Sequence, residues 1–246
     1  MSTQTAALVT GAASGIGKCV AERFAADDRH DVVACLDLDP AVHDLPDAIG
    51  SSVQSHECDV ADHDAIGDVI QRIEADADIH AVVNNAGISR YFWIGDLEPD
   101  EWDRILDVNL KGQYNVARHA TPPMFERETG YVVNVSSGAG QRGSASGGVH
   151  YSAAKAGVLG LTKGLAKQLG PHVNVNCVVP GLIDTPLMSD SGLWDAEGIA
   201  EFEAGLPLER VGDPDEVARV IEFCCGPGAE YMTGSVVNVD GGGSLS

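Results

Sequence analysis

Tyr151 and Lys155 stand four residues apart in the segment YSAAK, which opens a stretch of helical spacing that continues to Leu169. Residues i and i+4 share one face of a helix, so the phenol and the ammonium are expected side by side. A free tyrosine has a pKa of about 10, and a fixed neighbouring cation is a direct means of making it an acid or base near pH 7. The pair predicts proton transfer, although the same spacing also occurs on ordinary exposed helices.

A glycine-rich turn, TGAASGIG at residues 10–17, directly follows a β-branched run and directly precedes a helical segment. Its glycines would let backbone N–H groups approach a pyrophosphate at a helix N-terminus, where the helix dipole favours anions. The spacing Gly-x-x-x-Gly-x-Gly departs from the Gly-x-Gly-x-x-Gly fingerprint of dinucleotide sites. The turn therefore predicts phosphate binding, with a purely structural turn as the alternative.

Asp37 closes the next β-branched run, 20 residues after Gly17. A carboxylate at this place accepts hydrogen bonds from adenosine ribose hydroxyls. It would repel the 2′-phosphate of NADP, and neither Leu38 nor Asp39 supplies a cation for that phosphate. We therefore expect NAD as the cofactor. The alternative is a solvated loop carboxylate in an Asp-rich chain.

The elements that must position these residues alternate along the whole chain. Short β-branched runs occur at 6–10, 32–36, 53–58, 81–83, 131–135, 173–179 and 235–239, separated by stretches of helical spacing such as 66–73 and 158–169. Strands divided by helices imply right-handed crossovers and a parallel sheet covered on both faces. We predict one α/β domain over residues 1–246, doubly wound around a seven-stranded parallel sheet.

The motifs together resemble those of the short-chain dehydrogenase/reductase family, in the family's order and over essentially the whole chain. They are the turn at 10–17, Asp59-Val60, Asn84-Asn85-Ala86-Gly87, Asn109, Ser136-Ser137, Tyr151 with Lys155, Pro180-Gly181 and the closing segment 233–242. The resemblance implies a Rossmann-type fold and hydride transfer between NAD(H) and a secondary alcohol or ketone. The pattern is most similar to 3-oxoacyl-thioester reductases, with sugar and polyol dehydrogenases close behind. A non-catalytic NAD-sensing module is a remote alternative, because all four catalytic positions are filled.

The resemblance assigns four residues to catalysis. Tyr151 would be the general acid/base, Lys155 would lower its pKa and hold the nicotinamide ribose, and Asn109 would hold a water for proton relay to Lys155. A serine would hydrogen-bond the substrate carbonyl. We match Ser137, although its 14-residue separation from Tyr151 is slightly longer than the family's usual interval, and Ser136 stays open.

The cofactor contacts implied by the resemblance run from the glycine turn to the loop after the sixth strand. They are Gly11, Ser14, Gly15, Ile16 and Gly17 at the diphosphate; Asp37, Asn85, Ala86 and Gly87 at the adenosine ribose; Asp59 and Val60 at the adenine; Tyr151 and Lys155 at the nicotinamide ribose; and Pro180, Gly181, Ile183 and Thr185 toward the nicotinamide carboxamide. Each has an alternative as a turn residue, and Asn84 is expected to stabilise the sheet instead.

Substrate identity has the weakest signal in the sequence. The residues expected to line the pocket are Arg90, Gln141, Arg142, His150, Met188 and Trp194, the last two in a lid at about 186–206. The two arginines are scarce cations that would receive an anionic or thioester-linked group, or else form surface ion pairs. The histidine would hydrogen-bond a polar substrate, or else be satisfied by the backbone.

The charge balance restricts the partners. The chain has 37 acidic and 15 basic residues, a net charge of −22, and 44% hydrophobic residues. Such a polyanion repels phosphate backbones and anionic lipid surfaces, so we expect no nucleic-acid or membrane partner. No apolar run approaches the roughly 18 residues of a membrane span.

Six cysteines without Cys-x-x-Cys and eight scattered histidines predict no disulfide and no metal site. We expect a cytoplasmic protein acting on a small ketone or alcohol, and the resemblance implies a homotetramer or dimer.

The charge also predicts adaptation to a high-salt cytoplasm, as in a halophile, because salt shortens the range of self-repulsion. Ordinary solubility is the alternative explanation. A series of thermal melts in increasing KCl should show stability rising steeply with salt. Melting temperatures that do not change with KCl would contradict the expectation.

Overall fold

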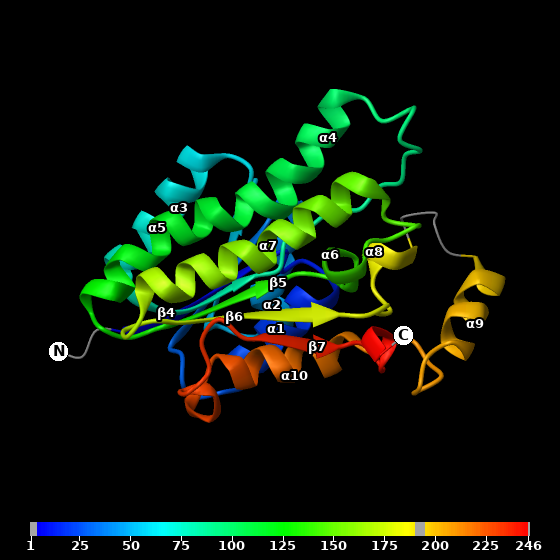
Figure 1. Ribbon diagram of the computed structural model, residues 1–246. Helices are drawn as coiled ribbons and strands as arrows, with labels where there is room; N and C mark the ends of the chain where they lie inside the picture. The colour runs from blue at the N-terminus through cyan, green and yellow to red at the C-terminus, as the bar shows by residue number, and fades with distance from the viewer. Residues whose placement is uncertain (1–3, 190–194, 246) are drawn as a thin grey trace.

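A seven-stranded parallel sheet forms the centre of the computed structural model, which describes residues 4–189 and 195–245 (Figure 1). The strand order is β3-β2-β1-β4-β5-β6-β7. The strands are β1 (Gln4–Thr10), β2 (Val32–Asp37), β3 (Val53–Glu57), β4 (Ala77–Asn84), β5 (Tyr131–Val135), β6 (Asn174–Pro180) and β7 (Val236–Val239). The predicted Rossmann-type doubly wound fold and all seven predicted strands are confirmed. β4 begins four residues earlier than predicted.

Helices cover both faces of this sheet, with α3, α5 and α7 on one face and α1 and α10 on the other (Figure 1). The α-helices are α1 (Gly15–Ala25), α2 (Leu45–Ile49), α3 (His63–Asp76), α4 (Pro99–Leu106), α5 (Gly112–Glu126), α6 (Gly138–Arg142), α7 (Gly148–Leu169), α8 (Pro186–Ser189), α9 (Ala196–Ala204) and α10 (Pro214–Cys224). A π-helical segment, Asp107–Lys111, joins α4 to α5. In the described part of the chain, no helix combines the length and apolar character needed to cross a bilayer.

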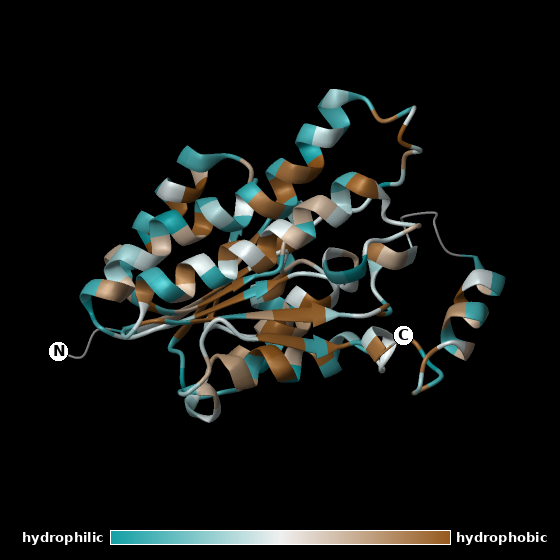
Figure 2. Cartoon of the chain, in the orientation of Figure 1, coloured by the Kyte–Doolittle hydropathy of each residue, from teal (hydrophilic) through white to brown (hydrophobic). Residues whose placement is uncertain are grey.

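The core is divided by the sheet into two apolar clusters. Side chains alternate along β1, so Val9 packs with Phe24 of α1 on one face while Leu8 packs with Ile66 of α3 on the other. All four side chains are fully buried. Figure 2 shows hydrophobic colour concentrated on the strands and on the helix faces that meet them. The double covering explains why the strands are apolar runs rather than alternating ones.

A chain of buried polar groups ties the centre of the sheet to α7. The Asn84 amide donates to Asn134 Oδ1 at 2.9 Å, and the Asn134 amide donates to Thr162 Oγ1 at 2.9 Å. The Thr162 hydroxyl donates in turn to the Val158 carbonyl at 2.8 Å. The network holds α7 at a fixed height on the sheet, which is the stabilising role expected of Asn84.

The strand order reverses between β1 and β4, because β1 is followed along one direction by β2 and along the other by β4. At such a switch point, the loops at the carboxyl ends of the two strands diverge and leave a crevice. The glycine turn follows β1 and residues 85–87 follow β4. The fold therefore brings these two predicted motifs to one place.

Candidate active site

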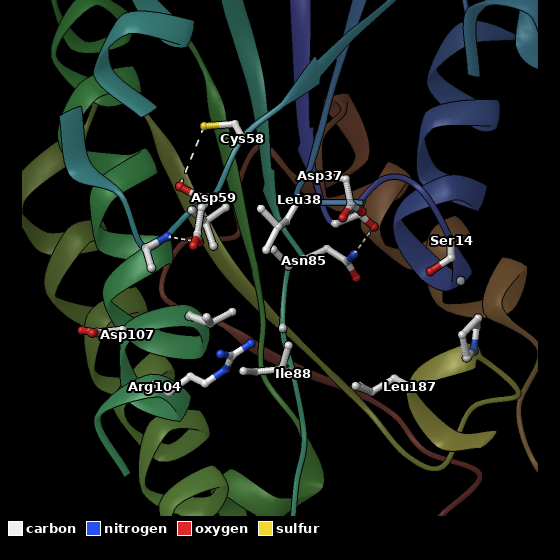
Figure 3. A pocket seen from close by; sticks show the side chains of 18 of the residues that line it. Ser14, Asp37, Leu38, Cys58, Asp59, Asn85, Ile88, Arg104, Asp107 and Leu187 are labelled. Carbon is white, nitrogen blue, oxygen red and sulfur yellow. Dashed lines mark hydrogen bonds between the residues drawn. The ribbon is translucent and has the colours of Figure 1, made fainter. Parts of the chain in front are cut away.

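Two joined cavities lie along the carboxyl edge of the sheet. The first, about 790 Å³, extends from the glycine turn to α4 (Figure 3). The second, about 570 Å³, lies over the end of β5 and the start of α7. Both are lined by Ile16, Asn85 and Thr185, so they form one continuous groove. Its length suits an elongated ligand in the first cavity that reaches a second, smaller molecule in the second cavity.

The glycine turn closes one side of the first cavity. Gly11 and Gly15 have φ values of +66° and +53°, which side chains disfavour, and a β-carbon on Gly17 would collide with the Gly11 carbonyl oxygen. The N-terminus of α1 has no capping hydrogen bond from Ser14 and no acidic residue in its first turn. Its free N–H groups and dipole are therefore available to an anion.

The carboxylates of Asp37, which ends β2, and Asp59, which follows β3, line one end of the first cavity. Asp37 accepts from the Ala13 N–H at 2.9 Å and from the Asp39 N–H at 3.0 Å, which fixes its carboxylate beside the glycine turn. Asp59 lines the same cavity, and Figure 3 shows both side chains. The neighbouring Leu38 is 58% exposed and offers no charge. This end suits free ribose hydroxyls better than a phosphate.

Tyr151, Lys155 and Ser137 meet in the second cavity. The Lys155 Nζ lies 5.7 Å from the centre of the Tyr151 ring and donates to the Val135 carbonyl at 3.1 Å. The Ser137 oxygen accepts from the Ala139 N–H at 3.2 Å and so begins α6. Since that bond uses only the oxygen, the hydroxyl hydrogen of Ser137 remains able to donate.

The two neighbouring serines have different surroundings. The Ser136 hydroxyl is 3% exposed and donates to the Lys155 carbonyl at 2.7 Å, which ties the end of β5 to α7. Ser137 lines the second cavity together with Tyr151, and its side chain lowers the pKa of that phenol. The geometry thus places Ser137 beside the phenol and gives Ser136 a structural bond.

Burial shifts both titratable groups. It raises the pKa of Tyr151, and the hydrogen bond with Ser137 lowers that pKa in part. It lowers the pKa of Lys155 to about 8. The phenol is therefore protonated near neutral pH, whereas the Lys155 ammonium loses its proton only a little above neutral pH.

Asn109 lies on the π-helical segment, fully buried. Its amide donates to the carbonyls of Ile88 at 2.9 Å and Ile105 at 3.0 Å. A β-carbon on Gly87 would lie 2.8 Å from Asn109 Oδ1 and 3.4 Å from Lys155 Nζ. The two polar atoms, which belong to different helices, therefore approach the same side of Gly87. π-Helical turns inside α-helices occur often at functional sites.

Comparison with known proteins agrees with this geometry. A family model described as enoyl-(acyl carrier protein) reductase matches residues 11–244. The chain is 38% identical over 242 residues to a 3-oxoacyl-(acyl-carrier-protein) reductase, FabG, from Chlamydia muridarum, covering 96% of each chain. The chain belongs to the short-chain dehydrogenase/reductase family. It is accordingly an oxidoreductase that acts on CH–OH groups with a nicotinamide cofactor, and its sequence is of the 3-oxoacyl-thioester reductase type.

Two solved structures from the short-chain dehydrogenase/reductase family show the same architecture. A 3-oxoacyl-(acyl-carrier protein) reductase from Brucella melitensis with bound NAD is 35% identical, has a TM-score of 0.84, and covers 98% of this chain and 91% of its own. An aldohexose dehydrogenase from Thermoplasma acidophilum is 33% identical, has a TM-score of 0.88, and covers 99% of this chain and 95% of its own. Both substrate classes considered from the sequence are thus represented among similar structures.

The groove of this short-chain dehydrogenase/reductase gathers most of the predicted cofactor residues. Those lining the first cavity are Gly11, Ser14, Gly15, Ile16, Asp37, Asp59, Val60, Asn85, Ala86 and Gly87. Those lining the second are Tyr151, Lys155, Pro180, Gly181, Ile183 and Thr185. Gly17 lies beneath the turn, buried and outside the lining, where its missing side chain lets the turn close.

The predicted substrate residues are divided by the structure. Arg142 and Met188 line the second cavity. Gln141 donates instead to Asn238 Oδ1 at 2.9 Å, and Arg90 forms an ion pair with Glu101 at 3.3 Å. Neither Gln141 nor Arg90 lines either cavity. For Arg90 the surface ion pair is thus the alternative that the structure shows. Trp194 lies outside the described residues.

His150 is placed differently from the prediction. It is fully buried, with its ring 6.2 Å from that of Phe92, and both ring nitrogens lack a hydrogen-bond partner among the described residues. Burial lowers the pKa of its imidazole. The expectation that it lines the pocket is wrong, because successive residues on a helix point about 100° apart. When Tyr151 faces the cavity, the preceding side chain faces the inside of the protein.

Some cavity residues were not predicted from the sequence. Phe202 of α9 lines the second cavity, and Arg104 of α4 lines the first, where Figure 3 shows it pointing inward. Phe202 is an aromatic residue in a short acidic helix, which is a usable signal for a ligand-facing side chain. Arg104 gave no such signal, because the face that α4 turns to the cavity depends on the π-helical segment after it.

Proposed function

We propose that this chain reduces 3-oxoacyl thioesters to 3-hydroxyacyl thioesters with NADH. The observation that carries the proposal is the meeting of Tyr151, Lys155 and Ser137 in a cavity that continues into the glycine-turn groove. The similarity to 3-oxoacyl reductases supports the substrate class. The similarity to an aldohexose dehydrogenase supports a sugar or polyol dehydrogenase as the second candidate.

The residues of the first cavity suit a nicotinamide dinucleotide. The glycine turn leaves no room for a β-carbon at Gly17, the N-terminus of α1 is uncapped, and Asp37 is fixed beside the turn by the Ala13 N–H. These groups would hold the diphosphate and the adenosine ribose. When bound, the cofactor supplies a hydride to the substrate carbonyl carbon. The Asp37 carboxylate supports NAD over NADP.

The chain's own residues would handle the oxygen and its proton. Ser137 would donate a hydrogen bond to the carbonyl oxygen, and the Tyr151 O–H would donate its proton to that oxygen as it gains negative charge. Burial keeps the phenol protonated before the reaction. The nearby Lys155 ammonium then stabilises the phenolate left behind. In alcohol oxidation the same phenolate would accept the proton.

Reprotonation of Tyr151 needs a path to solvent. We infer that Lys155 passes a proton to the phenolate and regains one through a water held by Asn109. The support is the approach of Asn109 Oδ1 and Lys155 Nζ to the same side of Gly87. The pKa of Lys155, about 8, makes its proton easy to give up and regain near neutral pH.

The remaining expectations also stand as proposals. We infer that the chain acts as one domain with a lid at about 186–206, which contains α8 and α9. A homotetramer or dimer through α5 and α7 is supported by Gly160 and Gly164, where an added β-carbon would meet nothing within 4 Å. A high-salt cytoplasm as its setting is supported by the net charge of −22.

Tyr151→Phe tests the proposed reaction. With acetoacetyl-CoA and NADH, turnover followed at 340 nm should fall by about 10²- to 10⁴-fold, because the proton donor is lost. NADH binding, measured by fluorescence titration, should stay within about twofold. Tyr231→Phe, at a fully exposed tyrosine, is the matched control and should keep full activity.

Either of two results would contradict the proposal: substantial turnover by Tyr151→Phe, or no turnover of the thioester by the wild-type protein. If the wild type oxidises an aldohexose with NAD⁺ but leaves the thioester unchanged, the second candidate function replaces the first.

Asp37→Asn tests the cofactor preference. Removing the charge should lower the ratio of kcat/KM for NADH to that for NADPH by at least about tenfold, because repulsion of the 2′-phosphate is lost. Asp47→Asn removes an equal charge from an exposed carboxylate of α2 that does not line the cavity, so it should leave the ratio unchanged. An unchanged ratio in Asp37→Asn would refute the assignment.

A further inference from the structure

The two halves of the groove differ sharply in charge. Of the residues described, six carboxylates and a single arginine, Arg104, line the first cavity; the carboxylates are those of Asp37, Asp59, Asp100, Glu101, Asp103 and Asp107. The second cavity has no Asp or Glu among its described lining residues, although the chain contains 37 acidic residues in 246. Its charged side chains are Lys155 and Arg142. The second cavity is thus the part of the groove where an electron-rich group of a ligand would not be repelled by a lining carboxylate.

Within this cavity the Lys155 ammonium already has a hydrogen-bond partner, whereas Arg142 has no carboxylate partner. The Lys155 ammonium is buried and bonded to the Val135 carbonyl. Arg142 is exposed and forms no ion pair with any residue in the described part of the chain. By contrast, Arg23, Arg127 and Arg210 each bond a carboxylate at 2.8 Å or less. Among the described residues, Arg72, Arg104 and Arg118 also have no ion pair, but none of them lines the second cavity. A cation left without a carboxylate in so acidic a protein has its donors available to a ligand.

The position of Arg142 relates it to the reacting carbonyl. It ends α6, the short helix that Ser137 caps, and its side chain reaches back over the first turn. A β-carbon on Gly138 would lie 2.9 Å from Arg142 Nη2, so the guanidinium rests against the residue that follows Ser137. Glycine at 138 leaves the space that the guanidinium occupies. Arg142 and Ser137 therefore present donors to neighbouring parts of one cavity.

We propose that Arg142 binds the C1 oxygen of the substrate, the carboxyl-derived oxygen that stands two carbons away from the reacting ketone. This inference rests on the proposed function and defines it further. Ser137 and Tyr151 hold the C3 oxygen, while the planar guanidinium, with five N–H donors and no acceptor, bonds the C1 oxygen of a thioester or ester. An isolated ketone has no such oxygen. Arg142 would thus make the enzyme selective for 1,3-dicarbonyl substrates.

The test compares two ketones in one variant. Arg142→Gln is assayed with NADH on ethyl 3-oxobutanoate and on 2-hexanone, a ketone of similar length without the C1 oxygen. For the ester, kcat/KM should fall by about 10- to 100-fold, as expected for the loss of a hydrogen bond to a charged donor. The change should lie mainly in KM, because the contact exists before and during the reaction. For 2-hexanone, the change should be below about threefold.

Two further variants complete the test. Arg72→Gln removes the same charge from an exposed residue of α3 that lines neither cavity, and it should leave both substrates unaffected. Arg142→Lys keeps the charge and should recover part of the loss on the ester. Circular dichroism and NADH titration verify that each variant is folded and binds cofactor.

The outcomes separate the two proposals. Equal losses on both ketones, or no loss on either, would overturn the role of Arg142 while the wild-type activity on the ester still supports the proposed function. Failure of the wild type to reduce ethyl 3-oxobutanoate and acetoacetyl-CoA would overturn the proposed function, and the role of Arg142 with it.

Discussion

The ammonium of Lys155 is buried, and the structure of the second cavity must compensate for the cost of removing this charge from water. It is 3% exposed, and its hydrogen bond in the described structure goes to the Val135 carbonyl at 3.1 Å. A buried cation without a carboxylate is costly, so the surroundings must be rigid enough to keep the few dipoles in place. Ser136 meets this need by bonding the Lys155 carbonyl, and Gly140 by letting α6 approach α7 closely, since a β-carbon there would lie 2.5 Å from the Lys155 backbone.

The two cavities give one acidic protein two opposite electrostatic environments, one rich in carboxylates and one whose described lining residues include none. The cavity at the glycine turn is lined by carboxylates and relies on the N-terminus of α1 to attract a diphosphate. The cavity at Tyr151 has no carboxylate among its described lining residues, so the field of Lys155 acts on the phenol without local opposition. Although the chain has a net charge of −22, its carboxylates therefore do not line the place where a phenolate must form.

Features that depend on local sequence could be predicted, and features that depend on packing could not. The seven strands followed from β-branched runs because both faces of a parallel sheet are buried. The start of β4 was missed because Asp78 and His80 interrupt the apolar run; both are only partly buried. The glycine turn and the Tyr151–Lys155 pair were found because a turn and helix spacing fix them locally, whereas Asn109 and Ser137 were assigned from the resemblance to the family. Whether His150 faced the cavity depended on the rotation of α7, and the π-helical segment at Asn109 depended on contacts with Ile88, so neither showed in the sequence.

The most direct test of this account is the pKa of the Lys155 ammonium. The chain has five lysines, so a protein carrying ¹³C at the lysine ε-carbons gives few signals, and Lys155→Met identifies the one from Lys155. The structure predicts that this signal titrates at about pH 8, well below the ordinary lysine value of 10.5. A Lys155 signal that titrates near 10.5 would show that the ammonium is solvated, and it would contradict the buried proton-transfer site described for Tyr151 and Lys155.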